Sequence, residues 1–304
     1  MTVFRLQQFS IEQNLSGMKV CSDSLLFGAM IPVAGAKCIL DIGTGTGLLA
    51  LMQAQKVHSE RESAVIKITA IELTQEAAEE AGKNFNASPW PDSFELIEQD
   101  VQSFSAQYKA HSDLQNKARK DVAVNGFDLI ICNPPFFDDH TRTQTRLPET
   151  RKDLQSDQRK DELRGIARHT DTLSYLELCA AMSNLLSREG RGYVLLPTSA
   201  INVFAETANS VGLALDCITD IAESCDYPAK VAMLELKHRS YIQSNIQSPD
   251  LSPSHHPNPN PNPNPNCSEI DSISKTTLYK FGKDKRHSAE TKHYLSPFLL
   301  RYAD

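Results

Sequence analysis

Short apolar runs separated by longer, more polar stretches dominate the chain between residues 38 and 240. Five of these runs are predicted to be strands, at 39–42, 67–72, 94–98, 127–132 and 192–197, and 127–132 has the composition of a buried strand. Helical stretches lie between them, and such alternation predicts βαβ units and a parallel sheet. Residues 174–186 carry apolar side chains near helical spacing and are predicted to form the helix before the fifth strand.

Two further apolar segments, 214–223 and 231–238, are joined by the turn sequence Asp226-Tyr227-Pro228. They predict an antiparallel hairpin at the end of the sheet. The expected fold is therefore α/β, with a mostly parallel, seven-stranded sheet and an antiparallel terminal hairpin. The polar stretch 107–125 interrupts this pattern and is interpreted as an extended surface loop or a short helix.

Composition divides the chain into four regions. Residues 1–37 are expected to form a short segment and a helix that cap the sheet, and 38–240 the main α/β domain. Residues 241–274 contain five Pro-Asn dipeptides that begin at Pro257. Alternating proline cannot sustain a helix or a central strand, so this region is predicted to be a flexible linker, with a ligand for a partner as the alternative. Residues 275–304 are basic and are expected to pack back onto the main domain.

The overall composition is that of a globular protein, because the 304 residues are 40% hydrophobic and 23% charged. The sequence has no apolar run of about 18 residues, and its N-terminus has no basic region followed by an apolar segment. We therefore expect neither a membrane span nor secretion. The seven cysteines have no metal-ligand spacing, which predicts reduced thiols, no metal site and a cytoplasmic location. No obligate protein partner is indicated.

The formal net charge of −7 is unusual for a nucleic-acid-binding protein, which commonly has a basic surface. The last thirty residues differ from the rest, since 275–304 contain seven Lys or Arg residues and three acids. We predict a phosphate-contacting patch there. A second basic run, 142–168, is interleaved with acids, and a solvated helix or loop explains it equally well.

The sequence Asn133-Pro134-Pro135-Phe136 directly follows the apolar run 127–132. This places an amide side chain and a rigid turn at the carboxyl end of a buried strand, where open α/β sheets bind ligands. The two prolines have no N–H group, so the turn presents acceptors, namely the Asn133 side-chain oxygen and the Pro134 carbonyl. An NH₂ group has two N–H donors for them, and Phe136 supplies a face on which a planar ring can stack. The turn therefore predicts a site for an exocyclic amine.

A second motif begins at the strand 39–42, which contains Asp41 and runs into a turn with Gly43, Gly45 and Gly47. Glycines in such a turn let a ligand approach the backbone closely, and the following helix offers free N–H groups. The next two strands each lead to an acid. Glu72 is suited to hold ribose hydroxyls, and Asp100 can accept a hydrogen bond from an adenine amino group.

These motifs resemble the successive strand ends of class I, Rossmann-like S-adenosylmethionine-dependent methyltransferases. In chain order they are Asp41 with the glycine turn, Glu72, Asp100 and the Asn-Pro-Pro-Phe turn. The resemblance implies S-adenosylmethionine as cofactor, with Gly43, Gly45 and Gly47 along its methionine part. Asp41 is then expected to bind the cofactor or, alternatively, to orient the glycine turn. The Asn-Pro-Pro-Phe signature is similar to that of the branch that methylates amino nitrogens. It implies catalytic roles for Asn133, Pro134 and Phe136.

A narrower resemblance comes from segments outside these motifs. These segments are similar to the bacterial tRNA adenine-N6 methyltransferases that modify adenine 37 of a valine tRNA. They are residues 9–13 and 18–29, Ala87-Ser88-Pro89-Trp90, Ala167-Arg168-His169 and the closing 295–300. This implies tRNA as the partner, substrate contacts from Pro135, Phe137 and Arg168, and a role for Asp23 at the methionine end. The family pattern has Gly-Thr before this Asp, whereas this chain has Cys21-Ser22.

Other functions remain compatible with the same motifs. The acceptor could instead be an rRNA adenine, the N2 of guanine or a protein glutamine. A non-catalytic RNA-binding protein is disfavoured by the intact acceptor turn and the two cofactor acids. A nicotinamide dehydrogenase is disfavoured by the G-x-G-x-G spacing, which differs from the dinucleotide-binding fingerprint.

Overall fold

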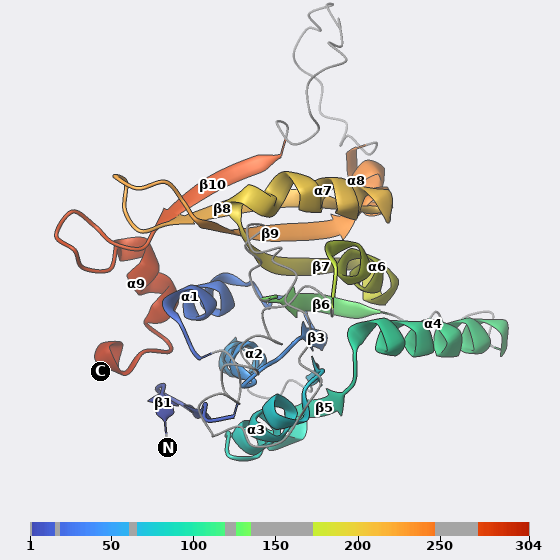
Figure 1. The fold of residues 1–304 in the computed structure, drawn as a ribbon, viewed down its shortest axis with the longest axis horizontal. Coiled ribbons are helices and arrows are strands. Elements are labelled where there is room, and N and C mark those ends of the chain that lie inside the picture. The colour runs from blue at the N-terminus through green and yellow to red at the C-terminus, as the bar shows by residue number, and fades with distance from the viewer. Residues whose placement is uncertain are drawn as a thin grey trace, which may run out of the picture.

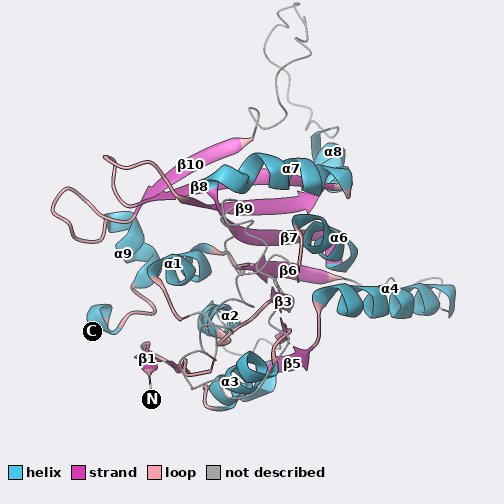
Figure 2. Cartoon of the chain, viewed as in Figure 1, coloured by secondary structure: helices cyan, strands magenta, loops and turns pink. Residues whose placement is uncertain are grey.

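The structure is a computed structural model that describes residues 2–15, 19–60, 66–118, 126–134, 173–246 and 273–303. Its centre is a twisted sheet with helices on both faces (Figures 1 and 2). No helix in these ranges combines the length and the apolar character needed to cross a bilayer.

The large sheet has the strand order β10-β8-β9-β7-β6-β3-β4-β5. Its strands are β3 (Cys38–Ile42), β4 (Lys67–Glu72), β5 (Phe94–Glu98), β6 (Phe127–Cys132), β7 (Leu186–Pro197), β8 (Leu213–Ala222), β9 (Val231–His238) and β10 (Ser274–Tyr279). Only β9 runs antiparallel to its neighbours, β7 and β8. The predicted α/β fold, with its mostly parallel sheet and antiparallel terminal hairpin, is confirmed. A separate two-stranded hairpin consists of β1 (Val3–Arg5) and β2 (Ser10–Glu12).

The helices form two layers. The α-helices are α1 (Ser22–Met30), α2 (Leu48–Glu60), α3 (Gln75–Asn86), α4 (Val101–Ala118), α6 (Tyr175–Leu185), α7 (Ile201–Ser210), α8 (Arg239–Ile246) and α9 (Ala289–Leu295). Short 3-10 helices cover Pro91–Ser93, Thr198–Ala200 and Leu300–Tyr302. Residues of α1, α2, α3 and α9 share one hydrophobic core, and residues of α4, α6 and α7 share the core on the other face.

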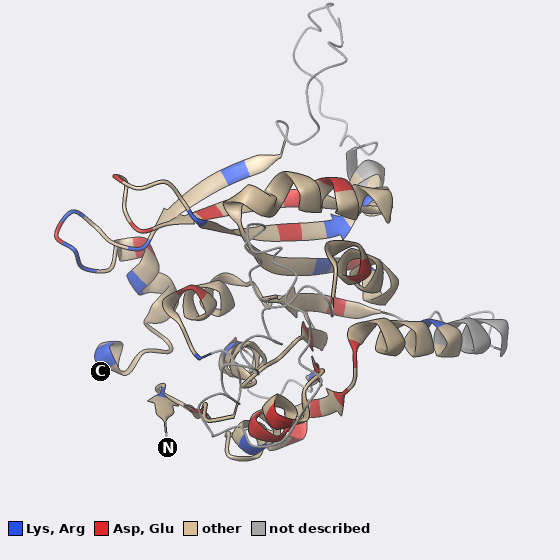
Figure 3. Ribbon diagram, viewed as in Figure 1, with Lys and Arg blue, Asp and Glu red and all other residues tan. Residues whose placement is uncertain are grey.

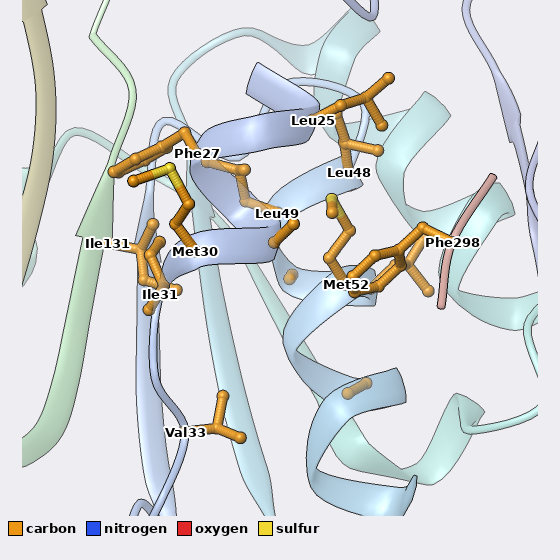
Figure 4. Close-up of a cluster of buried hydrophobic side chains, with 14 of the residues drawn as sticks. Leu25, Phe27, Met30, Ile31, Val33, Leu48, Leu49, Met52, Ile131 and Phe298 are labelled. Carbon is orange, nitrogen blue, oxygen red and sulfur yellow. The ribbon is translucent and has the colours of Figure 1, made fainter. Parts of the chain in front are cut away.

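Close packing of α1 on α2 fills the first core (Figure 4). A Cβ atom at Gly28 would lie 2.7 Å from the Met52 sulfur, so a larger residue at this position would push the two helices apart. Phe298, from the C-terminal segment, is buried in the same core beside Met52. Residues nearly 250 positions apart in the sequence therefore build one core.

The sheet has eight strands where seven were expected, and the additional strand is β10. It pairs in parallel with β8, from Ser274 opposite Cys217 to Tyr279 opposite Ala222. Only Leu278 of its six residues is buried, because β10 is an edge strand with one neighbour. A strand with one buried side chain lacks the apolar run by which strands are recognised in a sequence.

The structure of two polar stretches differs from what the sequence predicts. The expected loop or short helix at 107–125 is, as far as residue 118, the second part of the long helix α4, and 119–125 lie outside the described residues. The predicted linker 241–274 begins later than expected, since α8 continues to Ile246. Residues 247–272 lie outside the described ranges, so the linker stays a prediction.

One carboxyl group, that of Asp41 on β3, is completely buried at the centre of the sheet. Its Oδ2 accepts hydrogen bonds from the Thr44 hydroxyl (2.7 Å) and the Ala50 N–H (3.2 Å), and thus ties the turn after β3 to the first turn of α2. Its Oδ1 has no hydrogen-bond partner among the described residues. Burial raises the pKa of Asp41 from 3.8 to about 7.

A buried lysine joins the C-terminal segment to the rest of the molecule. Lys280, directly after β10, has a side chain only 9% exposed, and its ammonium lies 2.8 Å from Asp23 Oδ1 on α1. The same ammonium forms an ion pair with Glu223, the residue after β8. The predicted phosphate-contacting patch therefore excludes Lys280. Lys275, which pairs with Asp220 at 3.0 Å, lies on the strand itself.

We expect Lys280→Ala to lower the free energy of unfolding by about 2–3 kcal/mol, since Asp23 and Glu223 would lose their shared cation. Lys67→Ala is the matched control, because both side chains of its pair with Glu95 are exposed and this pair should contribute less than about 1 kcal/mol. Urea denaturation of both variants measures the difference. Equal effects of the two substitutions would contradict a structural role for the Lys280 pairs.

Asp41 should make stability depend on pH. Between pH values of about 4 and 7 the folded state keeps the Asp41 proton that the unfolded chain has lost, so this contribution to stability falls as pH rises. Asp41→Asn removes the titration, and the stability of wild type relative to this variant should decline across that window and then level off. Urea denaturation at several pH values tests this, and parallel curves would show that Asp41 does not hold its proton.

Candidate functional site

The carboxyl ends of four neighbouring parallel strands meet at one edge of the sheet. Ile42, the last residue of β3, is in register with Cys132 of β6 on one side and with Ile71 of β4 on the other. Gly43 and Asn133 therefore each follow the paired ends of adjacent strands, which lie about 4.8 Å apart. Glu72 closes β4 opposite Glu98 of β5, and Asp100 follows two residues later. The turns that the sequence singled out thus lie side by side.

The glycine turn after β3 has a backbone that only glycine adopts readily. Gly43, Gly45 and Gly47 have φ angles of +68°, +57° and +83°. A Cβ at Gly47 would lie 2.5 Å from the Phe85 ring, so this glycine is required by the packing of α3. At Gly43 and Gly45 a Cβ would meet no atom within 4 Å. These two glycines therefore border open space, into which a ligand can approach the backbone.

Glu72 is bound to the glycine turn. Its Oε2 accepts the Gly45 N–H at 2.9 Å, and its Oε1 accepts the N–H and hydroxyl of Thr74 at 3.1 and 3.0 Å. A carboxylate offers about four acceptor positions, of which three are used here. The predicted grip on two ribose hydroxyls therefore requires one of these bonds to be exchanged.

Asp100 caps the helix that follows β5. Its Oδ1 accepts the Ser103 N–H at 2.7 Å, which satisfies one of the free donors at the start of α4. This hydrogen bond lowers the pKa of Asp100, so the carboxyl group is ionised at neutral pH. The other carboxylate oxygen remains an acceptor, as the predicted contact with an adenine amino group requires.

The acceptor turn is described as far as Pro134. Asn133 is half-buried and Pro134 is buried. The predicted catalytic and substrate contacts of four further residues stay predictions, because these residues lie outside the described ranges. They are Pro135, Phe136, Phe137 and Arg168.

Asp23 lies in the first turn of α1, whose N-cap is Cys21. The Cys21 sulfur accepts the Ser24 N–H at 3.4 Å and the Ser24 hydroxyl accepts the Cys21 N–H at 3.3 Å, so Cys21 and Ser24 form a capping box. The Asp23 carboxylate pairs with Lys280. Its predicted role at the methionine end remains a prediction, and Lys280 is the neighbour that orients it.

Two residues at this edge were not predicted from the sequence. Leu73, directly after Glu72, is 47% exposed, and it offers an apolar surface next to the acid. Asn84 on α3 is buried and donates to the carbonyls of Thr46 (2.8 Å) and Glu12 (3.0 Å), so it links the glycine turn to β2. A Leu directly after a predicted strand can be recognised in the sequence, whereas the contacts of Asn84 depend on the tertiary structure.

Together these groups fit S-adenosylmethionine. The glycine turn has open backbone for the methionine part, Glu72 is an acceptor for ribose hydroxyls, and Leu73 with Asp100 offers an apolar and an acidic contact for adenine. These groups are distributed over the ends of β3, β4 and β5, as a long ligand spread along the edge of the sheet requires.

The first part of the chain is similar to a known family of methyltransferases. A family model described as O-methyltransferase matches residues 1–132. The match includes the glycine turn, Glu72 and Asp100 but ends immediately before Asn133, so it does not bear on the acceptor turn. A solved structure of a predicted O-methyltransferase from Agrobacterium tumefaciens is 15% identical, with 89% of this chain and 94% of that chain covered and a TM-score of 0.47.

Two curated relatives extend past the acceptor turn. A protein of Shewanella sediminis is 33% identical over 237 residues, which cover 78% of this chain and 83% of the relative. A protein of Shewanella pealeana is 37% identical over 78% of this chain and 80% of the relative. Both are named tRNA1(Val) (adenine(37)-N6)-methyltransferase. By this similarity over most of its length, and with the strand-end residues in place, the chain belongs to the tRNA1(Val) (adenine(37)-N6)-methyltransferase family.

Proposed function

We propose that this protein transfers a methyl group from S-adenosylmethionine to the N6 amino group of adenine 37 in a valine tRNA. Its relatives carry that name, and the register of β3 with β6 is the structural observation that supports it most directly. This register brings the acceptor turn beside the glycine turn, as a direct transfer between two bound ligands requires. The tRNA is then its partner, and the cytoplasm its place of action.

Binding of the cofactor is assigned to the strand ends of β3, β4 and β5. Gly43 and Gly45 would approach the methionine part, Glu72 the ribose, and Leu73 and Asp100 the adenine. When bound, S-adenosylmethionine supplies a methyl group on a positively charged sulfur, which makes it an electrophile and removes the need for a metal.

The acceptor turn would prepare the nucleophile. An adenine amino nitrogen is weakly nucleophilic because its lone pair is delocalised into the ring. The Asn133 side-chain oxygen and the Pro134 carbonyl would accept its two N–H bonds, which favours a tetrahedral nitrogen and localises the lone pair. Phe136 would hold the ring by stacking after the base has left the anticodon loop. This is positioning and electrostatic stabilisation without a strong general base.

The pair of acceptors supports an amino group over a hydroxyl group, which has one hydrogen to donate. Other amino acceptors, such as an rRNA adenine or a protein glutamine, satisfy the same two oxygens. The similarity of the relatives over most of the chain favours the tRNA adenine. The chemistry of the turn does not distinguish among amino acceptors, whereas methylation of total RNA does.

Asn133→Ala should lower kcat by on the order of a hundred- to a thousandfold, since one of the two groups that hold the amine is lost. Binding of S-adenosylmethionine, measured by calorimetry, should stay within about threefold, because Asn133 does not contact the predicted cofactor groups. Asn86→Ala, at an exposed position at the end of α3, is the control and should behave as wild type. Normal turnover by the Asn133 variant would exclude the amine-holding role.

The substrate is tested with total RNA from a strain that lacks the gene. Incubation with enzyme and labelled S-adenosylmethionine should place the label in a valine tRNA, as N6-methyladenine at position 37. Unlabelled RNA from a strain with the gene, already modified, serves as the control. Label in rRNA, in guanine or in protein would overturn the proposed substrate.

A further inference from the structure

We propose that a small basic hairpin between β10 and α9 binds the phosphate backbone of the RNA substrate. The hairpin comprises residues 281–287 and is called the basic loop below. The inference rests on the proposed function, because it assigns to this surface the RNA whose adenine enters the site. It replaces the broader C-terminal patch expected from the sequence, since Lys275 and Lys280 form ion pairs within the protein.

Sheet topology places the basic loop at the catalytic edge. β9 runs antiparallel to both β7 and β8, so β8 points the same way as β7 and β6. β10 is parallel to β8, and its carboxyl end is therefore at the edge where Asn133 follows β6. Four strand spacings separate the two, or about 19 Å. A base held at Asn133 and a phosphate held by the loop are thus a few nucleotides apart in one RNA.

The loop has a defined shape. Phe281 and His287 form an antiparallel bridge, the Gly282 N–H donates to the Arg286 carbonyl at 2.9 Å, and the Lys285 N–H donates to the Gly282 carbonyl at 3.0 Å. Lys285 is the one non-glycine residue with positive φ, +61°, in the described part of the chain. This conformation suits Gly or Asn better than Lys. A cation therefore occupies a turn position that its backbone does not favour.

Three cations of the loop are available to a ligand. Lys283, Lys285 and Arg286 are exposed, and none forms an ion pair with another described residue. The carboxylate of Asp284 accepts the Arg286 backbone N–H at 3.1 Å, so this acid shapes the turn. The cations project from a preformed hairpin, which reduces the entropy lost on binding.

The charge around the loop extends the same surface. Two further exposed cations follow it, Lys292 on α9 and Arg301 near the C-terminus. From 281 to 303 the chain has five Lys or Arg residues and two acids, in a protein of net charge −7. Figure 3 shows this basic loop and C-terminal segment on one side, with acids gathered over α3 and β5. Such a separation of charge orients a polyanion toward the loop and away from α3.

The decisive variant is the triple change Lys283→Gln, Lys285→Asn and Arg286→Gln in the full chain. Asn tolerates the positive φ at 285, and the hydrogen bonds of the loop come from the backbone and Asp284, so the hairpin should persist. The matched control is Lys37→Gln, Lys67→Gln and Lys83→Gln, which removes the same charge from exposed positions. Lys37 and Lys67 lie at the amino ends of β3 and β4, on the opposite edge of the sheet.

Methylation of an unmodified valine tRNA transcript is measured for wild type and both variants over a range of salt concentrations. The basic-loop variant should raise KM for tRNA on the order of tenfold at about 0.1 M salt, with kcat within about twofold. The slope of log KM against log salt should become shallower by about two units, and the control should follow wild type. Binding of labelled tRNA, measured without turnover, should rank the three proteins in the same way, with a raised Kd for the basic-loop variant and a similar Kd for wild type and the control.

Two failures are distinguishable. If wild type methylates the transcript but the basic-loop variant and the control shift KM and salt slope equally, the basic loop does not bind RNA and the proposed function stands. If wild type neither binds nor methylates tRNA, the proposed function itself fails and this inference fails with it. A folded basic-loop variant, checked by its unfolding curve, excludes loss of structure as the cause of a raised KM.

Discussion

Parallel pairing of β3 with both β4 and β6 is the constraint on which the site depends. Because Ile42 is in register with Ile71 and with Cys132, the residues that follow these strands emerge together at one edge. A slip of one residue would turn every side chain of a strand to the other face of the sheet. The buried apolar residues of β3 and β6 on both faces oppose such a slip, since both cores would lose their contacts.

The acids at this edge also hold the protein together. Asp41 bonds the turn to α2, Glu72 accepts the Gly45 N–H, and Asp100 caps α4. Carboxylates with two oxygens can bond backbone on one side and a ligand on the other. Glu72 and Asp100, which are expected to contact the cofactor, therefore also position the elements around it, whereas the completely buried Asp41 positions the turn without reaching a ligand.

The C-terminal segment completes both the core and the catalytic edge. Phe298 is buried in the core beside Met52 of α2, while Lys280 pairs with Asp23 at the start of α1. These contacts fix the position of the hairpin that follows β10. An acidic protein can in this way present a local basic surface, because association with RNA depends on where cations lie and not on the total charge.

Much of this architecture follows from the sequence. The strands at 67–72, 94–98, 127–132 and 231–238 have the predicted boundaries, since short segments rich in apolar residues mark them in the sequence. The glycine turn and the acids after β4 and β5 were also recognised, because their chemistry is local. The tertiary structure decided what depends on distant partners: the strand β10, with one buried residue, the link from Asn84 to the glycine turn, and the pairing of Lys280 with Asp23. Residues more than 250 positions apart leave no periodic signal in a single sequence, so only the folded chain shows that they meet.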